Sequence, residues 1–254
     1  MRYSLGICIP VWNRGEIFRI AFDSLLAQLE GIEATIWLFD NGSDPATRRI
    51  VEEIRSDVHR IHKVMLPRNM GVPYVANLFA MAVQEDCEFA QYRSPSYVMI
   101  MDSDAYFKAP IKDLLDLHNI WYGIGLLSGH DSLEHPAIET KEVELNGKRV
   151  LMKRKENERM ITMIMRKEEF AMCHPFPHYR DRDVDWELTQ WNANSMLRRG
   201  RFICVACGYV LHLGIASSTW SGGVDRHASP EEIREVREIL RHNSAAVPSS
   251  AGNT

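Results

Sequence analysis

Hydrophobic residues in the first hundred positions follow two alternating spacings. Four short apolar runs have the length of buried β-strands, and they cover residues 4–9, 34–39, 63–66 and 97–101. Between these runs apolar residues recur every three or four positions, which predicts helices over residues 16–29, from residue 45 onward, and over residues 72–83. Strands separated by helices indicate right-handed crossovers. We therefore expect an α/β fold with a mainly parallel sheet covered by helices on both faces.

The second half of the chain is less regular. Asn146 and Gly147 separate two short segments, so residues 142–154 are predicted to form a β-hairpin. Further elements are expected as a strand over residues 159–165, a helix over 184–199, a buried strand over 202–213 and a charged helix over 230–241. No shift in composition marks a domain boundary, so we expect a single domain.

Composition excludes several classes of protein. The 254 residues carry a net charge of −4, which gives no general reason to expect a nucleic acid or an anionic membrane as partner. No run approaches the roughly 20 apolar residues of a transmembrane helix, and no segment has the layout of a signal peptide. Cys204 and Cys207 have C-x-x-C spacing but no second pair, so we expect buried thiols rather than a zinc site. These features predict a cytoplasmic protein, free or peripheral to a membrane.

Each of the four predicted strands is followed by a polar loop. The loops cover residues 10–14, 40–44, 67–71 and 102–104. In open parallel sheets ligands bind at the carboxyl ends of strands, and parallel pairing would bring these loops to one edge. The coincidence of four such loops, rather than any one of them, indicates a binding site.

Asp102 and Asp104 are the most informative pair in these loops. They follow the fourth apolar run directly, and their spacing of two places both carboxylates on one side of an extended backbone. Neighbouring carboxylates repel each other unless a cation or solvent compensates them. Mg²⁺ and Mn²⁺ accept carboxylate oxygens and keep positions open for phosphate oxygens. We expect a divalent metal here; the alternative is a solvated acidic turn.

Taken in order, the loops resemble the family-2 glycosyltransferases. The matching motifs are Pro10-Val11-Trp12-Asn13-Arg14, Asp40-Asn41-Gly42-Ser43, Arg68-Asn69-Met70-Gly71 and Asp102-Ser103-Asp104. The resemblance covers residues 1–105 and implies the nucleotide-sugar fold called GT-A. It also implies a glycosyltransferase domain over residues 1–242, in which residues 1–105 bind the nucleotide and residues 106–242 bind the acceptor. The small, polar residues 243–254 are expected to be disordered.

The resemblance also implies roles for individual residues. Those expected to contact the base and ribose near the first two strands are Pro10, Val11, Asn13 and Asp40, and Arg14 is a further candidate for nucleotide binding. Those expected near the base on the third loop are Arg68, Asn69 and Gly71. Asp102 would contact the ribose or the metal, Ser103 would lie beside the nucleotide, and Asp104 would bind the metal. For Arg14 a solvated surface charge is the alternative.

Inverting sugar transfer also needs a carboxylate that takes the proton from the acceptor hydroxyl. The segment Asp183-Val184-Asp185-Trp186-Glu187-Leu188 resembles the family's element for this role, with Asp185 in the position of the base. Asp183 is the second choice, because Val184 stands where the family has an acid. The alternative is a helix start whose acids complement the helix dipole.

His212 lies at the end of the last apolar run. Several metal-dependent members of this fold bring a late histidine to the cation, and His212 stands at the matching place. An imidazole ligand would suit Mn²⁺ better than Mg²⁺. A buried histidine that only packs in the core is the alternative.

The combined prediction is a metal-dependent, inverting glycosyltransferase that uses a nucleoside-diphosphate sugar. A UDP-sugar is the preferred donor because an acid follows the second strand. No motif identifies the acceptor, which could be a glycan, a lipid, a protein, a small molecule or a modified base. The sequence also leaves the oligomeric state open. One alternative is a non-catalytic nucleotide-sugar-binding protein of the same fold. A sugar-phosphate nucleotidyltransferase is disfavoured, because the loop after the first strand has no glycine-rich run.

Overall fold

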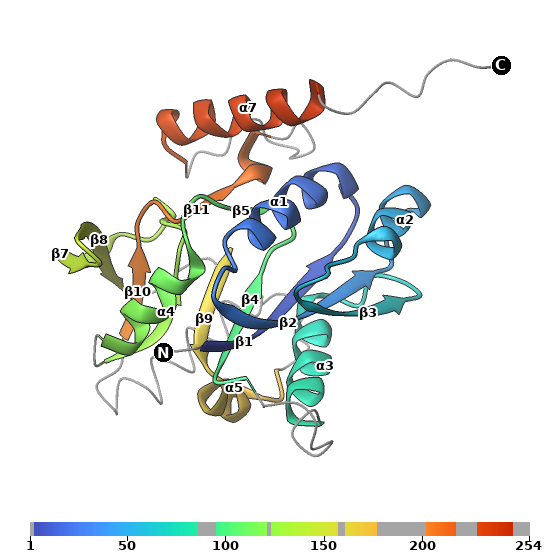
Figure 1. The fold of residues 1–254 in the computed structure, drawn as a ribbon, viewed down its shortest axis with the longest axis horizontal. Coiled ribbons are helices and arrows are strands. Elements are labelled where there is room, and N and C mark those ends of the chain that lie inside the picture. Colours follow the sequence, from blue (N-terminus) through green and yellow to red (C-terminus); the bar gives the residue numbers. More distant parts are fainter. Residues whose placement is uncertain are drawn as a thin grey trace.

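The protein is built around a nine-stranded sheet with helices on both faces (Figure 1). The strand order is β3-β2-β1-β4-β9-β6-β10-β8-β7, and β5 and β11 form a separate two-stranded sheet. This computed structural model describes residues 3–85, 95–120, 123–156, 161–176, 202–216 and 228–245.

Four strands form the parallel part of the sheet. They are β1 (Tyr3–Val11), β2 (Ile32–Asn41), β3 (Arg60–Leu66) and β4 (Tyr97–Met101). β1 pairs in parallel with β2 and β4, and β2 pairs in parallel with β3, so all four carboxyl ends lie at one edge. The four predicted strands are confirmed. Pro10 and Val11 were expected in a loop but are the last residues of β1, because the ladder with β2 continues to Phe39 and Asp40.

Helices cover the two faces of this sheet as separate layers. α1 (Gly15–Ala27), α2 (Pro45–Glu53) and α4 (Ile111–Ile120) contribute to one core, and α3 (Val72–Glu85) and α5 (Lys167–Cys173) contribute to the other. Alternation along β4 shows why both faces are apolar: Tyr97, Met99 and Met101 join the first core, and Val98 and Ile100 join the second. The predicted cap of α2 is confirmed, since the Asp44 carboxylate accepts from the Thr47 N–H at 2.8 Å.

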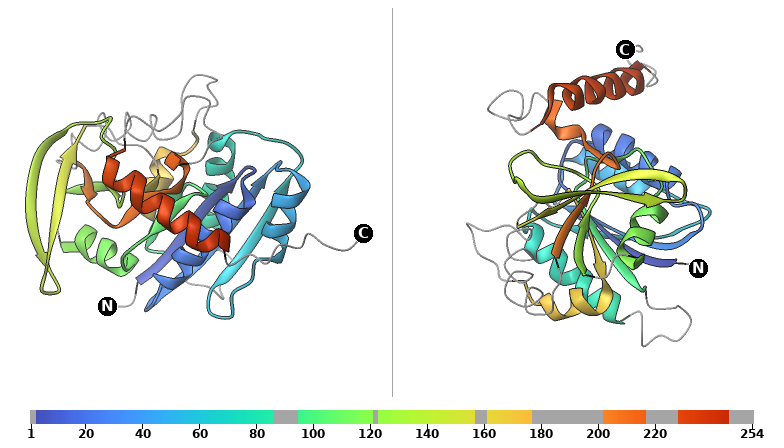
Figure 2. Two further views of the ribbon diagram at one scale, coloured as in Figure 1. Left: turned by 90° about the horizontal axis from the view of Figure 1, so that it is seen from above. Right: turned by 90° about the vertical axis from the view of Figure 1, so that its left-hand side faces the viewer.

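Beyond β4 the sheet is mixed rather than parallel. The remaining strands of this sheet are β6 (Ile124–Ser128), β7 (Ala137–Leu145), β8 (Lys148–Lys155), β9 (Thr162–Arg166) and β10 (Phe202–Ala206), whereas β5 (Ala105–Phe107) belongs to the two-stranded sheet. β9 is antiparallel to both β4 and β6, and β10 is parallel to β6, so β6 and β10 also end at the edge where β4 ends. The hairpin β7–β8 is confirmed, with positive φ at both Asn146 and Gly147 (Figure 2).

The expected strand over residues 202–213 is two strands. β10 ends at Ala206, the chain turns at Gly208 with φ of 85°, and β11 (Val210–His212) pairs with β5 instead. The single long strand was wrong because Gly208 adopts a left-handed conformation that a regular strand does not contain. This break moves His212 out of the main sheet and places it opposite Ala105.

The 3-10 helix η3 (Leu213–Ala216) and helix α7 (Pro230–Ala245) follow. α7 lies outside the two main layers and packs through Val236 on Ala21 of α1 and on Leu211 and Leu213 (Figure 1). It runs to Ala245, so residues 243–245, expected in a disordered tail, are helical. Within the described ranges, none of the helices combines the length and apolar character needed to cross a membrane. The predicted helix over residues 184–199 lies outside the described residues.

Candidate functional site

Hydrogen bonds join the loops after β1 and β2. The Asn13 N–H donates to Ser43 Oγ at 3.0 Å, and the Ser43 hydroxyl donates to the Val11 carbonyl at 3.3 Å. The Asp44 N–H donates to Asn13 Oδ1 at 2.9 Å. The two loops therefore form one polar surface at the carboxyl edge of the sheet.

Asn41 extends this surface to the loop after β3. Its side-chain amide donates to Asn69 Oδ1 at 3.0 Å and its Oδ1 accepts from the Met70 N–H at 2.8 Å. Gly42 makes the close approach possible: it has φ of 72°, and a Cβ on it would lie 2.2 Å from the carbonyl carbon of Arg68. Asn41 and Gly42 belong to the motif quoted for the resemblance but were not predicted as site residues.

Asp40, predicted to contact the nucleotide, is fully buried beneath this surface. One oxygen accepts from the Ser43 N–H at 3.0 Å, and the other accepts from Arg48 Nε at 2.7 Å. Arg48 also donates to the Leu66 carbonyl at 2.7 Å, so it links the ends of β2 and β3. In this structure Asp40 anchors the loops, and its contact with a ligand stays a prediction. No motif pointed to Arg48.

The turn between β1 and α1 is strained. Asn13 and Arg14 have φ of 57° and 54°, which costs a non-glycine residue about 1–2 kcal/mol each. Arg14 is the N-cap of α1 and makes no side-chain cap bond, so the strain is not explained by helix capping. Such outliers are typical of functional sites. Trp12, at the same turn, leaves 53% of its surface exposed.

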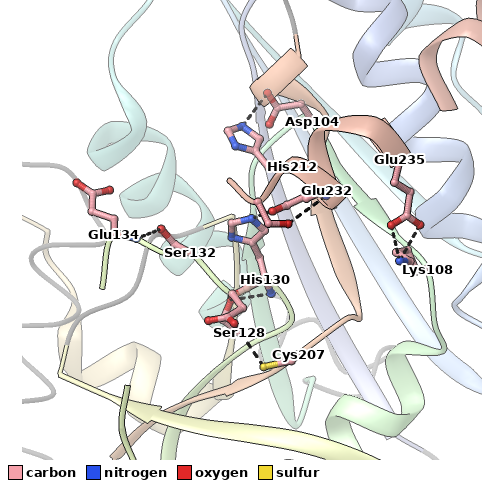
Figure 3. Close-up of polar contacts among 12 residues, drawn as sticks. Asp104, Lys108, Ser128, His130, Ser132, Glu134, Cys207, His212, Glu232 and Glu235 are labelled. Carbon is pink, nitrogen blue, oxygen red and sulfur yellow. Dashed lines mark hydrogen bonds and ion pairs between the residues drawn. The ribbon is translucent and has the colours of Figure 1, made fainter. Parts of the chain in front are cut away.

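Asp104 is the charged centre of the site (Figure 3). It is buried, and its Oδ2 accepts from Arg14 Nη1 and pairs with His212 Nε2, each at 3.2 Å. The pairing of β5 with β11 brings His212 here, and the Leu213 N–H donates to the Asp104 carbonyl at 2.9 Å. The structure thus brings together three of the predicted residues, from positions 14, 104 and 212.

The electrostatics of Asp104 favour its charged form. Burial alone would raise its pKa, but the charge and hydrogen bond of His212, followed by the charge of Arg14, outweigh burial and lower the pKa below the ordinary value. The result is a buried carboxylate whose ionised form is favoured by the His212 imidazole and the Arg14 guanidinium.

This pair fits a divalent cation that is shared with a ligand. Carboxylate oxygen and imidazole nitrogen are ligands that Mn²⁺ accepts. Gly214 packs against the pair so closely that a Cβ on it would lie 2.5 Å from Asp104 Oδ2 and 2.7 Å from His212 Nε2. Among the described residues no three His, Cys, Asp or Glu side chains are grouped closely enough to hold a metal alone. A cation at Asp104 and His212 would therefore leave positions for diphosphate oxygens or water.

The other predicted residues lie at the same edge or outside the described ranges. Asp102 and Ser103 are half-buried in the turn between β4 and β5, while Arg68 and Asn69 are exposed in the loop after β3. Pro10 is half-buried and the Val11 side chain is in the core, so Val11 offers a ligand its backbone only. Asp183 and Asp185 lie outside the described residues, so their role as base stays a prediction.

The C-x-x-C cysteines behave as expected for isolated thiols. Cys204 is buried and Cys207 is half-buried, and burial raises the pKa of each thiol to about 12. A thiol is a metal ligand or nucleophile only as the thiolate, so both groups are unreactive at neutral pH.

Comparison with known proteins gives a family match over part of the chain, and a fold. Residues 6–120 match the family described as Glycosyl transferase family 2, and no curated protein matches the chain significantly. One similar structure is PcManGT, a mannosyltransferase from Pyrobaculum calidifontis solved in complex with GDP-Man and Mn²⁺. Its sequence is 14% identical and the TM-score is 0.52; the match covers 98% of this chain and 77% of PcManGT. S. aureus TarS 1–349 is 17% identical with a TM-score of 0.55 over 94% of this chain and 65% of that one. At these identities the likeness shows the fold, which is GT-A.

Proposed function

We propose that this chain, whose residues 6–120 match the family described as Glycosyl transferase family 2 and whose fold is GT-A, is a glycosyltransferase that moves a sugar from a nucleoside-diphosphate donor to an acceptor hydroxyl with inversion and with a divalent metal. The observation that carries the metal-dependent part is the buried Asp104 carboxylate, paired with His212 where β4 ends. A buried charge is expensive to maintain, and this one lies at the edge where ligands bind in such sheets.

The residues of the site form two groups: one would bind the nucleotide of the donor, and the other would bind the divalent cation. The surface formed by Asn13, Ser43 and Asn41 is already ordered by its own hydrogen bonds, so little entropy is lost when a nucleotide binds. Trp12 offers an exposed aromatic face at the rim on which a base would stack. Asp104 and His212 would hold a divalent cation, and the charge of that cation would offset the charge of the departing diphosphate. The structure does not group Asp102 with these two side chains closely enough for all three to hold a metal.

Arg14 has a role in both states of the site. Without a donor its guanidinium neutralises Asp104, and 37% of its side chain is exposed at the rim. With a cation held at Asp104, the Arg14 guanidinium would be free to bind a phosphate oxygen, which it matches in charge and geometry. We propose Asp185, or in its place Asp183, as the base that accepts the proton of the acceptor hydroxyl.

For the donor we propose a UDP- or GDP-sugar, with UDP as the first choice. The acid at Asp40 motivated UDP, but in this structure both of its oxygens are engaged by Ser43 and Arg48. The mannosyltransferase that shares the fold was solved with GDP-Man, which makes GDP the second choice.

The test is release of nucleoside diphosphate from a panel of UDP-, GDP- and dTDP-sugars, with Mn²⁺, Mg²⁺ or a chelator present. We expect slow donor hydrolysis for one nucleotide class, faster with Mn²⁺ than with Mg²⁺ and abolished by the chelator. Tight nucleotide binding without hydrolysis or transfer under any of these conditions would instead support a non-catalytic binding protein.

A further inference from the structure

Among the described residues, two contacts between polar side chains join helix α7 to other parts of the protein, one at His130 and one at Lys108 (Figure 3). Glu232 Oε1 lies 3.2 Å from His130 Nε2; the His130 side chain is buried, with 8% exposed, and the Glu232 side chain is mostly covered, with 13% exposed. Glu235 lies 2.7 Å from Lys108, and both of those side chains are about one-third or more exposed, at 42% and 32%. Of these two contacts, the one between Glu232 and His130 is close to the site, because the His130 ring lies against the His212 ring.

His130 is held rigidly beside the strand that carries His212. It follows the carboxyl end of β6, where its N–H donates to Ser128 Oγ at 3.1 Å and its carbonyl accepts from the same hydroxyl at 3.0 Å. The preceding Gly129 carbonyl accepts from the Val210 N–H of β11 at 2.9 Å. The imidazole rings of His130 and His212 meet edge to face, with centroids 6.1 Å apart and planes at 83°.

Glu232 does not make the contact that its position in the helix would predict. Ser229-Pro230-Glu231-Glu232 has the spacing of a capping box, and Ser229 Oγ does accept from the Glu232 N–H at 3.1 Å. In a capping box the glutamate carboxylate would turn back to the backbone of the serine. Here it pairs instead with His130, 102 residues earlier in the chain. Its direction is therefore not explained by helix capping.

We propose that Glu232 and His130 are positioning residues for His212. Glu232 fixes the His130 ring, the His130 ring packs against the His212 imidazole, and His212 is thereby held toward Asp104. The inference rests on the proposed function, because it concerns how firmly the site holds a metal. Some residues do not touch the metal but orient the side chains that bind it. Replacing such a residue typically lowers metal affinity or activity by 10–100-fold.

This inference extends the site beyond the segment that matches the family. Residues 6–120 contain Arg14 and Asp104, whereas His130, His212 and Glu232 come from later in the chain. Helix α7 is then part of the metal-binding unit rather than a cover on α1.

The test measures Mn²⁺ binding by calorimetry in the presence of saturating UDP or GDP, whichever raises the melting temperature of the wild-type protein. We expect Glu232→Ala to weaken Mn²⁺ binding at least about 10-fold. Glu232→Gln should weaken it less, because its amide oxygen still accepts from His130 Nε2–H. The same variants should raise the Mn²⁺ concentration needed for half-maximal donor hydrolysis.

Two control variants separate positioning from general effects of α7. Glu235→Ala removes the other ion pair to the body, and Glu231→Ala removes an exposed acid from the same first turn. Both should bind Mn²⁺ like the wild type. Melting temperatures without ligand show that each variant is folded, and the near-isosteric Glu232→Gln keeps the test informative should Glu232→Ala not fold.

The outcomes distinguish this inference from the proposed function. If the wild type binds Mn²⁺ with a nucleoside diphosphate but Glu232→Ala and Glu232→Gln match the two controls, the positioning role is wrong and the proposed function stands. If the wild type binds no Mn²⁺ with either nucleotide, the proposed function fails, and the positioning role fails with it.

Discussion

The two sides of the site are built from different interactions. The surface formed after β1, β2 and β3 is held by neutral amides and hydroxyls above the buried Asp40–Arg48 ion pair, and its contacts join residues at most 32 positions apart in sequence. The centre at Asp104 is held by charges and imidazole rings, and its contacts join residues 90 to 108 positions apart. The first side requires the pairing of β1, β2 and β3, whereas the second also requires elements from late in the chain.

This difference has consequences for binding. We expect the surface formed after β1, β2 and β3 to keep its geometry when a ligand binds, because its groups already make hydrogen bonds with each other. The charged centre is balanced by Arg14 and His212, so a cation entering there has to redistribute existing contacts. We therefore expect changes on the neutral side to alter stability and donor affinity, and changes at the charged centre to alter metal dependence and turnover.

The largest expected effect comes from replacing the charge at the centre. Asp104→Asn keeps the shape but removes the negative charge that His212 and Arg14 share, so we expect donor hydrolysis to fall on the order of 1,000-fold. The assay compares rates at saturating Mn²⁺. Asp23→Asn, which changes an exposed acid paired with Arg19, is the control and should be unchanged. Rates for Asp104→Asn within a factor of three of the wild type would contradict the site.

A large effect on the neutral side is expected at Gly42. Gly42→Ala would place a Cβ 2.2 Å from backbone atoms of Arg68, and we expect a loss of about 3 kcal/mol or more in the free energy of unfolding. Gly31→Ala is matched, because Gly31 has a similar φ of 75° but nothing within 4 Å of an added Cβ. It should cost only about 1 kcal/mol, the strain of a left-handed residue. Equal losses in urea denaturation would show that the loops are not packed as described.

A smaller effect is expected at Asn41. Asn41→Ala removes two hydrogen bonds and leaves the Met70 N–H without its partner, so we expect a loss of about 1–3 kcal/mol in stability. Donor KM should rise while kcat changes little, because the surface binds the donor before and during the reaction alike. A fall in kcat with unchanged KM would place Asn41 in the chemistry instead.

The smallest effect is a pH dependence of stability at Asp131. Burial would raise its pKa, but hydrogen bonds and charges from Lys153 and Lys155 lower the pKa overall. A lowered pKa in the folded state means that this contribution is present at neutral pH and is lost as the pH falls below about 4. Asp131→Asn should therefore be less stable than the wild type at pH 7, by no more than about 2 kcal/mol. The difference should shrink toward pH 3; a difference that grew on acidification would contradict this sign.

The local side of the site was largely predictable from the sequence. Apolar runs gave the four parallel strands, and the loops that follow them were identified from their polar residues and turn glycines. Asp44 and Pro45 gave the start of α2, and Asn146-Gly147 gave the hairpin, because each signal lies within a few residues of the structure it determines.

The long-range side was only partly predictable. Asp104 and His212 were identified, but nothing near His130 or Glu232 in the sequence indicates that they meet 102 residues apart. Arg48 was not predicted for a similar reason. It links Asp40 to the Leu66 carbonyl, and these groups come together only when β2 and β3 are paired. The break at Gly208 was missed because the apolar residues on both sides of it continue the pattern of a single strand.

The most direct test of the central claim is anomalous diffraction at the manganese edge, from crystals grown with Mn²⁺ and a nucleoside diphosphate. The account predicts one strong peak in contact with Asp104 and His212, with diphosphate oxygens on its open side. A nucleotide bound at the loops after β1 and β2 with no manganese at Asp104, or manganese bound elsewhere, would contradict it.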